Sequence, residues 1–150
     1  MAEQKAKLPQ WMADHMKAYL DSNGEVGHLY DASAAGGPKA VPSLLLTTKG
    51  RKSGADLQLP LFYGETDDGK PVIVASKGGA PEHPAWYLNL AANPEVKVQI
   101  KGDKFRARAR TASGAERAQL WKKMNVVWPP YDSYQTKTDR EIPVVVLERI

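Results

Sequence analysis

The stretch VIVASKGGAPEHPAWYLNLAANP, residues 72–94, decides the fold because it predicts a strand, a glycine turn and a helix in succession. Its apolar first four residues are typical of a buried strand, and a short helix is expected over 84–92. Between them, Gly78 and Gly79 allow positive φ and close approach to a ligand, so that backbone N–H groups can point at an anion. Lys77 and the helix N-terminus add positive charge. The stretch therefore predicts an anion-binding turn, with an ordinary surface loop as the alternative.

The composition fits one globular domain without cysteine or metal chemistry. The 150 residues, 42% of them hydrophobic, can bury one core but are few for two domains. The chain has no cysteine, and the spacing of its three histidines is not that of metal ligands, so no metal is expected. The net charge of +4 slightly favours anionic ligands. No apolar run approaches the roughly 20 residues of a membrane span and no secretory signal is evident, so a cytoplasmic location is expected.

Short apolar runs and segments of alternating apolar and polar residues predict six mostly antiparallel strands. They are expected at 43–48, 57–63, 72–75, 96–100, 105–110 and 142–147, with the first three as a meander. Helices are expected on the margins at 9–22, 84–92 and 113–124, whereas the proline-containing segment 126–135 is not expected to form regular helix. Because six short strands need closure to avoid exposed edges, the sequence predicts a mainly β, α+β fold, a small closed or split β-barrel.

The N-terminal segment 1–41 is expected to precede the barrel domain, 42–150, within a single globular unit. Apolar and aromatic residues share one side of the predicted helix: Trp11, Met12, His15, Met16, Tyr19 and Leu20. This face is expected to pack on the core; capping a ligand pocket or resting on a membrane surface are alternatives. Glycines and prolines over 24–43 predict a long loop.

Two basic features and one aromatic segment are candidates for ligand binding. The hairpin tip 49–54, KGRKSG, carries three cations and two glycines, which suits carboxylates or phosphates but is also typical of a solvated turn. Three arginines share one strand face and are expected to be solvated: Arg106, Arg108 and Arg110. Three large rings in a proline-rich segment predict either a pocket for a planar substrate or the sealed edge of a core: Trp128, Tyr131 and Tyr134.

Four segments resemble the deazaflavin-dependent nitroreductase family. They are TTKGRKSG at 47–54, the tyrosine-ended strand at 57–63, VASKGGAPEHPAWYLNLAANPEV at 74–96 and WPPYDSYQ at 128–135. The resemblance runs from about Pro42 to the C-terminus. It implies an FMN-binding-like split β-barrel and the 8-hydroxy-5-deazaflavin coenzyme F420. Members of this family reduce quinones, activated alkenes and, in some cases, nitroimidazole prodrugs.

The resemblance also implies which residues bind the cofactor and which are catalytic. Residues expected to bind the cofactor are Lys49, Arg51, Lys52, Ser53, Ala75, Ser76, Lys77, Gly78, Gly79, His83, Trp86 and Asn89. Of these, His83 has a structural role as its alternative. The residues expected on the substrate side of the deazaflavin ring, and as catalytic, are Tyr131, Tyr134 and Ser76. Their hydroxyls would donate a hydrogen bond to a carbonyl oxygen while hydride passes to a quinone, an enone or another activated alkene, with nitro compounds as further substrates.

Three other readings remain open. An FMN-dependent reductase on the same barrel would purify with an ordinary flavin chromophore. A non-catalytic carrier would bind the deazaflavin without oxidising its reduced form. A nucleic-acid module would need a stronger electrostatic footprint than +4. No nucleic-acid partner is therefore expected, whereas peripheral membrane contact through the N-terminal helix is retained as a hypothesis.

Overall fold

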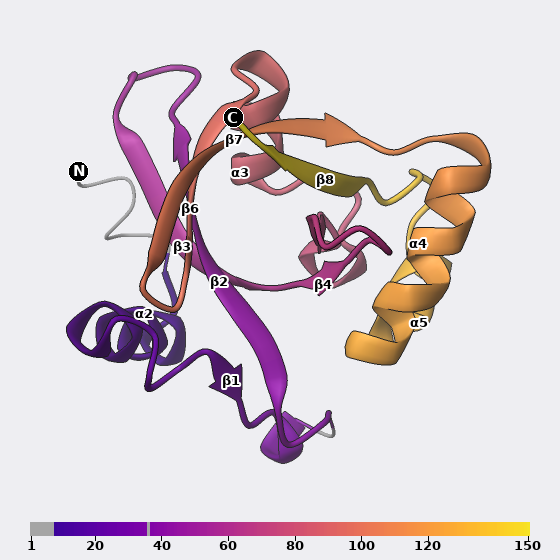
Figure 1. Cartoon of the computed structure of the whole chain (residues 1–150). Helices are drawn as coiled ribbons and strands as arrows, with labels where there is room; N and C mark the ends of the chain where they lie inside the picture. The colour runs from indigo at the N-terminus through magenta and orange to yellow at the C-terminus, as the bar shows by residue number, and fades with distance from the viewer. Residues whose placement is uncertain (1–7, 36) are drawn as a thin grey trace.

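A computed structural model describes residues 8–35 and 37–150, in which eight strands form one curled sheet (Figure 1). The first seven residues of the predicted N-terminal segment, and Gly36 of its loop, lie outside the described residues. In chain order the elements are α2 (Gln10–Ser22), β1 (Leu29–Tyr30), η1 (Ser33–Ala35), β2 (Val41–Lys49), β3 (Asp56–Phe62), β4 (Gly64–Glu65), β5 (Pro71–Val74), η2 (Lys77–Gly79), α3 (Ala85–Ala92), β6 (Glu95–Ile100), β7 (Asp103–Thr111), α4 (Gly114–Val127), α5 (Pro130–Thr136) and β8 (Val144–Arg149).

The strand pairings run in a circuit, which confirms the predicted split barrel. From β2 the antiparallel order continues through β6, β7, β8 and β5 to β4, and β3 pairs with β2. Only Tyr63 separates β3 from β4, so a single bent strand joins β2 at one end of the circuit to β5 at the other. The predicted meander was wrong at its third strand, because β5 pairs with β4 and β8 beyond this bend.

Alternation along the strands builds one core inside the barrel and another outside it. In β5, Ile73 belongs to the inner cluster and Val72 to the outer one, as expected when successive side chains point to opposite faces. Trp86 and Leu90 of α3 join the inner cluster. The outer cluster packs α4 and α5 against β5 and β8, so these helices cover one outer face of the barrel (Figure 1).

The segment 126–135 was predicted to be irregular, and this was wrong. The helix α4 continues to Val127 and a new helix, α5, begins at Pro130 after a break of two residues. Proline is well tolerated at the first position of a helix, because its missing N–H would have no partner there. The proline pair therefore starts a helix rather than preventing one, and this places Tyr131 and Tyr134 on the same short helix.

The N-terminal helix α2 packs on the barrel through the centre of its apolar stripe. His15 and Tyr19 are buried, whereas Trp11 and Leu20 are 49% and 41% exposed. At about 100° per residue, Trp11 and Leu20 lie on opposite edges of the stripe, which explains why both stay outside the contact. The Tyr19 hydroxyl lies 3.0 Å from the Ser43 carbonyl oxygen and accepts from the Lys101 N–H at 2.8 Å. Among the described helices, none combines the length and the apolar character needed to cross a membrane.

Candidate functional site

The turn between β5 and α3 is built from three successive residues with positive φ. Lys77, Gly78 and Gly79 have φ of 46°, 64° and 86°. The Gly79 N–H donates to the Ser76 carbonyl at 2.9 Å, and the Ala80 N–H donates to the Lys77 carbonyl at 3.1 Å. Within the described residues, the N–H groups of Lys77 and Gly78 have no recorded acceptor in the protein. The turn can therefore offer two N–H groups to an anion.

Helix α5 lies directly against this turn. A Cβ on Gly79 would lie 2.6 Å from the Tyr134 carbonyl oxygen and 3.0 Å from Lys137 Cβ. Only glycine accommodates both this close approach and the positive φ. The packing brings the predicted anion-binding turn beside the helix that carries both predicted catalytic tyrosines, although more than 50 residues separate them in the chain.

Arg140, 60 to 65 positions further along the chain, contacts the turn, and sequence reasoning missed it. Its guanidinium donates to three backbone carbonyls, those of Ala75 at 3.3 Å, Ser76 at 2.9 Å and Ala80 at 2.9 Å. A fourth contact joins its Nη1 to His83 Nδ1 at 3.0 Å. In the sequence, Arg140 is one cation in a polar loop between two acids, and no periodicity or spacing distinguishes it.

His83 is a half-buried histidine whose surroundings favour the neutral ring. Burial lowers its pKa below the ordinary value of 6.5, and the nearby charge of Arg140 lowers the pKa further. Because an arginine guanidinium is always a donor, Nδ1 must be the acceptor of their contact. The neutral ring therefore carries its proton on Nε2. On its other side, the ring packs against Tyr87 with centroids 4.9 Å apart.

Asn89 connects α3 to the basic hairpin tip. Its Oδ1 accepts from the backbone N–H of Arg51 at 3.2 Å and from the Arg51 Nη1 at 3.0 Å, and its Nδ2 donates to Thr48 Oγ1 at 3.2 Å. The side chains of Arg51, Lys52 and Ser53 are exposed at the tip. Asn89 therefore holds the tip, and with it the cation of Arg51, beside the helix that follows the turn.

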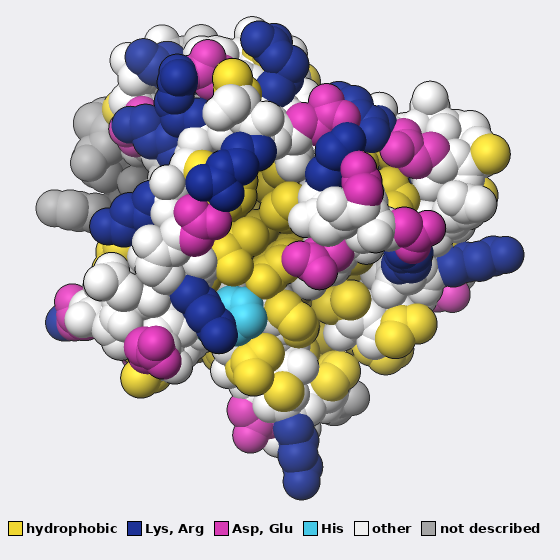
Figure 2. Space-filling view, in the orientation of Figure 1, with side chains coloured by type: hydrophobic (Ala, Val, Ile, Leu, Met, Phe, Trp, Pro, Cys, Tyr) yellow, Lys and Arg dark blue, Asp and Glu magenta, His cyan; other side chains and the backbone are white. Residues whose placement is uncertain are grey.

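The remaining predicted cofactor residues differ in exposure. Trp86 is 5% exposed and belongs to the inner core, and Ala75 is fully buried. Ser76 is half-buried, whereas Lys49 and Lys77 are exposed, with the Lys77 Nζ 3.2 Å from Glu82 Oε1. Figure 2 shows Lys and Arg side chains gathered over the upper part of one face of the molecule, above an apolar hollow at its centre.

The predicted aromatic segment forms a contiguous layer with both tyrosines in it. Tyr131 and Tyr134 meet edge to face at 6.2 Å, and the Trp128 Nε1 donates to the Tyr134 hydroxyl at 3.3 Å. The rings of Trp128 and Phe62 lie 4.9 Å apart. Burial raises the pKa of Tyr131 well above its ordinary range. A tyrosine hydroxyl is already protonated at physiological pH, so that of Tyr131 can donate a hydrogen bond.

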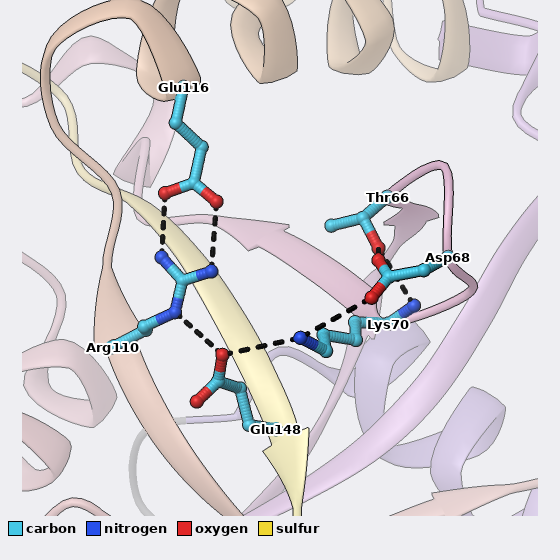
Figure 3. A network of polar contacts seen from close by, with 6 residues as sticks. All are labelled: Thr66, Asp68, Lys70, Arg110, Glu116 and Glu148. Carbon is cyan, nitrogen blue, oxygen red and sulfur yellow. Dashed lines mark hydrogen bonds and ion pairs between the residues drawn. The ribbon is translucent and has the colours of Figure 1, made fainter.

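A second polar cluster lies outside this site, and in it Arg110 of the predicted arginine stripe is paired with carboxylates (Figure 3). Arg110 donates to both carboxylate oxygens of Glu116, at 2.6 and 2.8 Å, and to Glu148 at 2.8 Å. Lys70 lies between Glu148 and Asp68. On the same strand, Arg106 pairs with Glu95 at 2.8 Å. These pairings favour a structural role for the two arginines over nucleic-acid binding.

Two further features bear on ligands. A shallow cavity of ≈ 440 Å³ lies beside β2 and β6, and Lys49 is its only lining residue among the predicted site residues. In the described ranges, no group of three or more His, Cys, Asp or Glu side chains is placed to hold a metal ion.

Comparisons with known proteins agree on one family. The family model described as F420H(2)-dependent quinone reductase matches residues 11–149. The F420H(2)-dependent quinone reductase Rv1261c of Mycobacterium tuberculosis is 39% identical over 138 residues, which cover 90% of this chain and 87% of the relative. A solved F420-H2 dependent reductase, FDR-A, is 48% identical with a TM-score of 0.65, covering 71% of this chain and 94% of that one. A structure described as a domain-swapped dimer is 41% identical with a TM-score of 0.68, covering 92% and 97%.

Proposed function

The chain belongs to the F420H(2)-dependent quinone reductase family, an oxidoreductase family, and on this premise we propose that it reduces a quinone with F420H2. The observation that supports the proposal is the packing of the Lys77–Gly79 turn, which we propose to bind an anion, against α5, the helix that carries Tyr131 and Tyr134. A polyanionic cofactor and an apolar, planar substrate both suit such a site.

The residues present fit a cofactor that carries a phosphate and several carboxylates. The N–H groups of Lys77 and Gly78 are available to phosphate oxygens, and the Lys77 side chain supplies a cation. At the hairpin tip, Arg51 and Lys52 are exposed and can meet further anionic groups of the cofactor. We propose that these residues hold F420, and that Asn89 contributes by fixing the position of the tip.

When bound, reduced F420 supplies a hydride from a ring carbon. The task of the protein is to orient the substrate and to stabilise the charge that develops on its carbonyl oxygen. We assign that hydrogen bond to the hydroxyl of Tyr131, with Tyr134 and Ser76 as further donors. The Tyr131 hydroxyl keeps its proton at neutral pH, as tyrosine ordinarily does, and burial raises its pKa further. The surrounding aromatic layer, with Trp128 and Phe62, excludes water from one side of the tyrosines.

The same arrangement extends the proposal to enones and other activated alkenes. Their conjugated carbonyl accepts a hydride and develops charge on oxygen as a quinone does, so the same hydroxyl donor serves both. Nitro compounds also place developing charge on oxygen, and we include them as a third, weaker substrate class.

One titration followed by one assay tests the proposal. Purified protein is titrated with oxidised F420 while the cofactor fluorescence is recorded, and F420H2 is then mixed with menadione or cyclohexenone while its oxidation is followed by absorbance. Binding with acceptor-dependent oxidation is expected. Binding without oxidation by either acceptor would instead support a carrier, and a bound flavin chromophore on purification would support an FMN enzyme. Absence of F420 binding would overturn the proposal.

A further inference from the structure

Arg140 contacts the loop between β5 and α3 at both of its ends. The four acceptors of its guanidinium all lie within the segment 75–83: three backbone carbonyls and one imidazole nitrogen. A guanidinium presents five N–H groups in a rigid plane, whereas a lysine ammonium is a point donor on a flexible stem. No other type of side chain can satisfy these four acceptors together.

The contact with Ser76 determines where a neighbouring N–H group points. The Ser76 carbonyl and the Lys77 N–H belong to the same planar trans peptide, so they point in opposite directions. Because the carbonyl accepts from Arg140 at 2.9 Å, the Lys77 N–H is directed away from the guanidinium. This N–H group is one of the two that have no recorded protein acceptor within the described residues. Arg140, together with the Gly79 N–H that donates to the same carbonyl, thus fixes the orientation of this peptide and directs the Lys77 N–H away from the guanidinium.

The contact with His83 fixes the position of the imidazole proton. Nδ1 accepts from Arg140, so the proton resides on Nε2, on the side of the ring away from the guanidinium. The aromatic ring of Tyr87 lies 4.9 Å from the imidazole, and Glu82, which precedes the histidine in the chain, pairs with Lys77. Arg140 is the charged group in direct contact with the ring, and it disfavours a second proton.

We propose that Arg140 is a positioning residue that directs the Lys77 N–H and the His83 Nε2–H to an anionic group of the ligand. Only the identity of that group, the phosphate of F420, rests on the proposed function. Arg140 itself does not contact the ligand, and its effect passes through the loop and His83. His83 then acts as a neutral hydrogen-bond donor rather than as an acid that supplies a proton.

The first test needs no cofactor. Nitrogen-15 NMR of the histidine side chains in wild-type protein is expected to show His83 with an unprotonated Nδ1 and a protonated Nε2. In Arg140→Gln the tautomers are expected to mix, and the pKa of His83 is expected to rise toward its ordinary value. Arg149→Gln is the matched control, because Arg149 also makes a two-point contact, with Asp103, on the exposed surface. A wild-type His83 protonated on Nδ1, or an unchanged spectrum in Arg140→Gln, would overturn the inference.

The second test measures ligand affinity. The Kd for oxidised F420 is expected to rise on the order of tenfold or more in Arg140→Lys and Arg140→Gln, since the donors lose their orientation. Arg149→Gln is expected to bind as the wild type does. Circular dichroism verifies that each variant is folded, and if Arg140→Gln does not fold, His83→Ala takes its place, because the three carbonyl contacts of Arg140 are then retained.

The outcomes separate the two proposals. Wild-type protein that fails to bind F420 overturns the proposed function and the identity of the anion, while the NMR measurement still decides the role of Arg140. If wild-type protein binds F420 and both Arg140 variants, or His83→Ala in their place, bind it equally well, this inference alone is overturned.

Discussion

Asn89 and Arg51, 38 positions apart in the chain, are joined by two hydrogen bonds to a single oxygen atom. The Asn89 Oδ1 accepts from the backbone N–H of Arg51 and from its guanidinium, at 3.2 and 3.0 Å. The amide group that makes these contacts is buried, with 3% of the residue exposed. The helix α3, which follows the Lys77–Gly79 turn in the chain, thus fixes the backbone of the otherwise exposed hairpin tip, residues 49–54.

We expect Asn89→Ala to weaken both the fold and cofactor binding. The change removes acceptors and donors from a buried site and is expected to cost about 1–3 kcal/mol in the free energy of unfolding. Because the tip loses its anchor, the Kd for F420 is expected to rise by roughly tenfold. Urea denaturation and fluorescence titration measure the two effects. Asn93→Ala, which alters a less buried asparagine just beyond the same helix, serves as the control; equal Kd values in the two variants would contradict the role of Asn89.

Two neighbouring glycines of the turn are expected to respond differently to alanine. Both have positive φ, so each substitution is expected to cost about 1 kcal/mol in backbone strain. A Cβ on Gly78 meets nothing within 4 Å, whereas one on Gly79 would lie 2.6 Å from the Tyr134 carbonyl. Gly79→Ala is therefore expected to separate the turn from α5 and to lower kcat and thermal stability well beyond Gly78→Ala. If the two variants show the same Tm and kcat, the close packing described above is not functionally important.

Tyr131→Phe is expected to lower kcat for menadione about 10- to 100-fold while leaving the Kd for F420 nearly unchanged, since one donor to the developing charge is lost. Tyr134→Phe is the comparison, because its hydroxyl also accepts from Trp128. Steady-state kinetics with each acceptor measures the effect. Burial raises the pKa of Tyr131, so ionisation of this residue is not expected to reduce activity below about pH 10. Full turnover in Tyr131→Phe would remove the residue from the mechanism.

The polar cluster in Figure 3 is expected to set part of the acid stability. Hydrogen bonds from Arg110 lower the pKa of Glu116 and of Glu148 below the ordinary value of 4.5. A carboxylate with a lowered folded pKa stabilises the fold above the unfolded pKa, and this contribution is lost as pH falls through the folded pKa. Arg110→Gln is thus expected to move acid unfolding to higher pH, and added salt to reduce the difference.

Circular dichroism along a pH series between neutrality and strong acid measures that shift. Lys122→Gln, on the exposed surface of α4, is the control for a lost surface cation. An acid midpoint that is the same in wild type and Arg110→Gln would show that the cluster contributes nothing below pH 4.5.

The barrel could be predicted from the sequence because the pattern of apolar residues within each strand indicates a strand without reference to distant contacts. In β5 and β8, alternate residues enter the inner and outer clusters, and the continuous apolar run that burial on both faces requires is visible in the chain. The bend at Tyr63 was not predictable, because nothing local distinguishes it from the end of a strand. The predicted apolar stripe of α2 was correct at its centre. Its edges, Trp11 and Leu20, are exposed on opposite sides of the helix, so membrane contact through one continuous face stays an unsupported prediction.

The candidate site likewise has features that could be predicted from the sequence and features that could not. The positive φ of Gly78 and Gly79 agrees with what their residue type predicts. The contacts of Arg140 and Asn89 were not predictable, because each joins segments between 38 and 65 positions apart and depends on tertiary packing. The role of each predicted site residue in binding or catalysis stays a prediction that the experiments above address.

The place of β8 in the circuit has a consequence for synthesis on the ribosome. This strand contains residues 144–149, yet it lies between β7 and β5 in the sheet. A nascent chain cannot complete this sheet until β8 has emerged, and Arg140, which contacts the loop between β5 and α3, emerges only shortly before it. A chain that ends before Arg140 therefore lacks both the strand that joins β7 to β5 and the guanidinium contacts to the loop. Closure of the sheet and completion of the contacts to this loop therefore become possible at nearly the same point of synthesis.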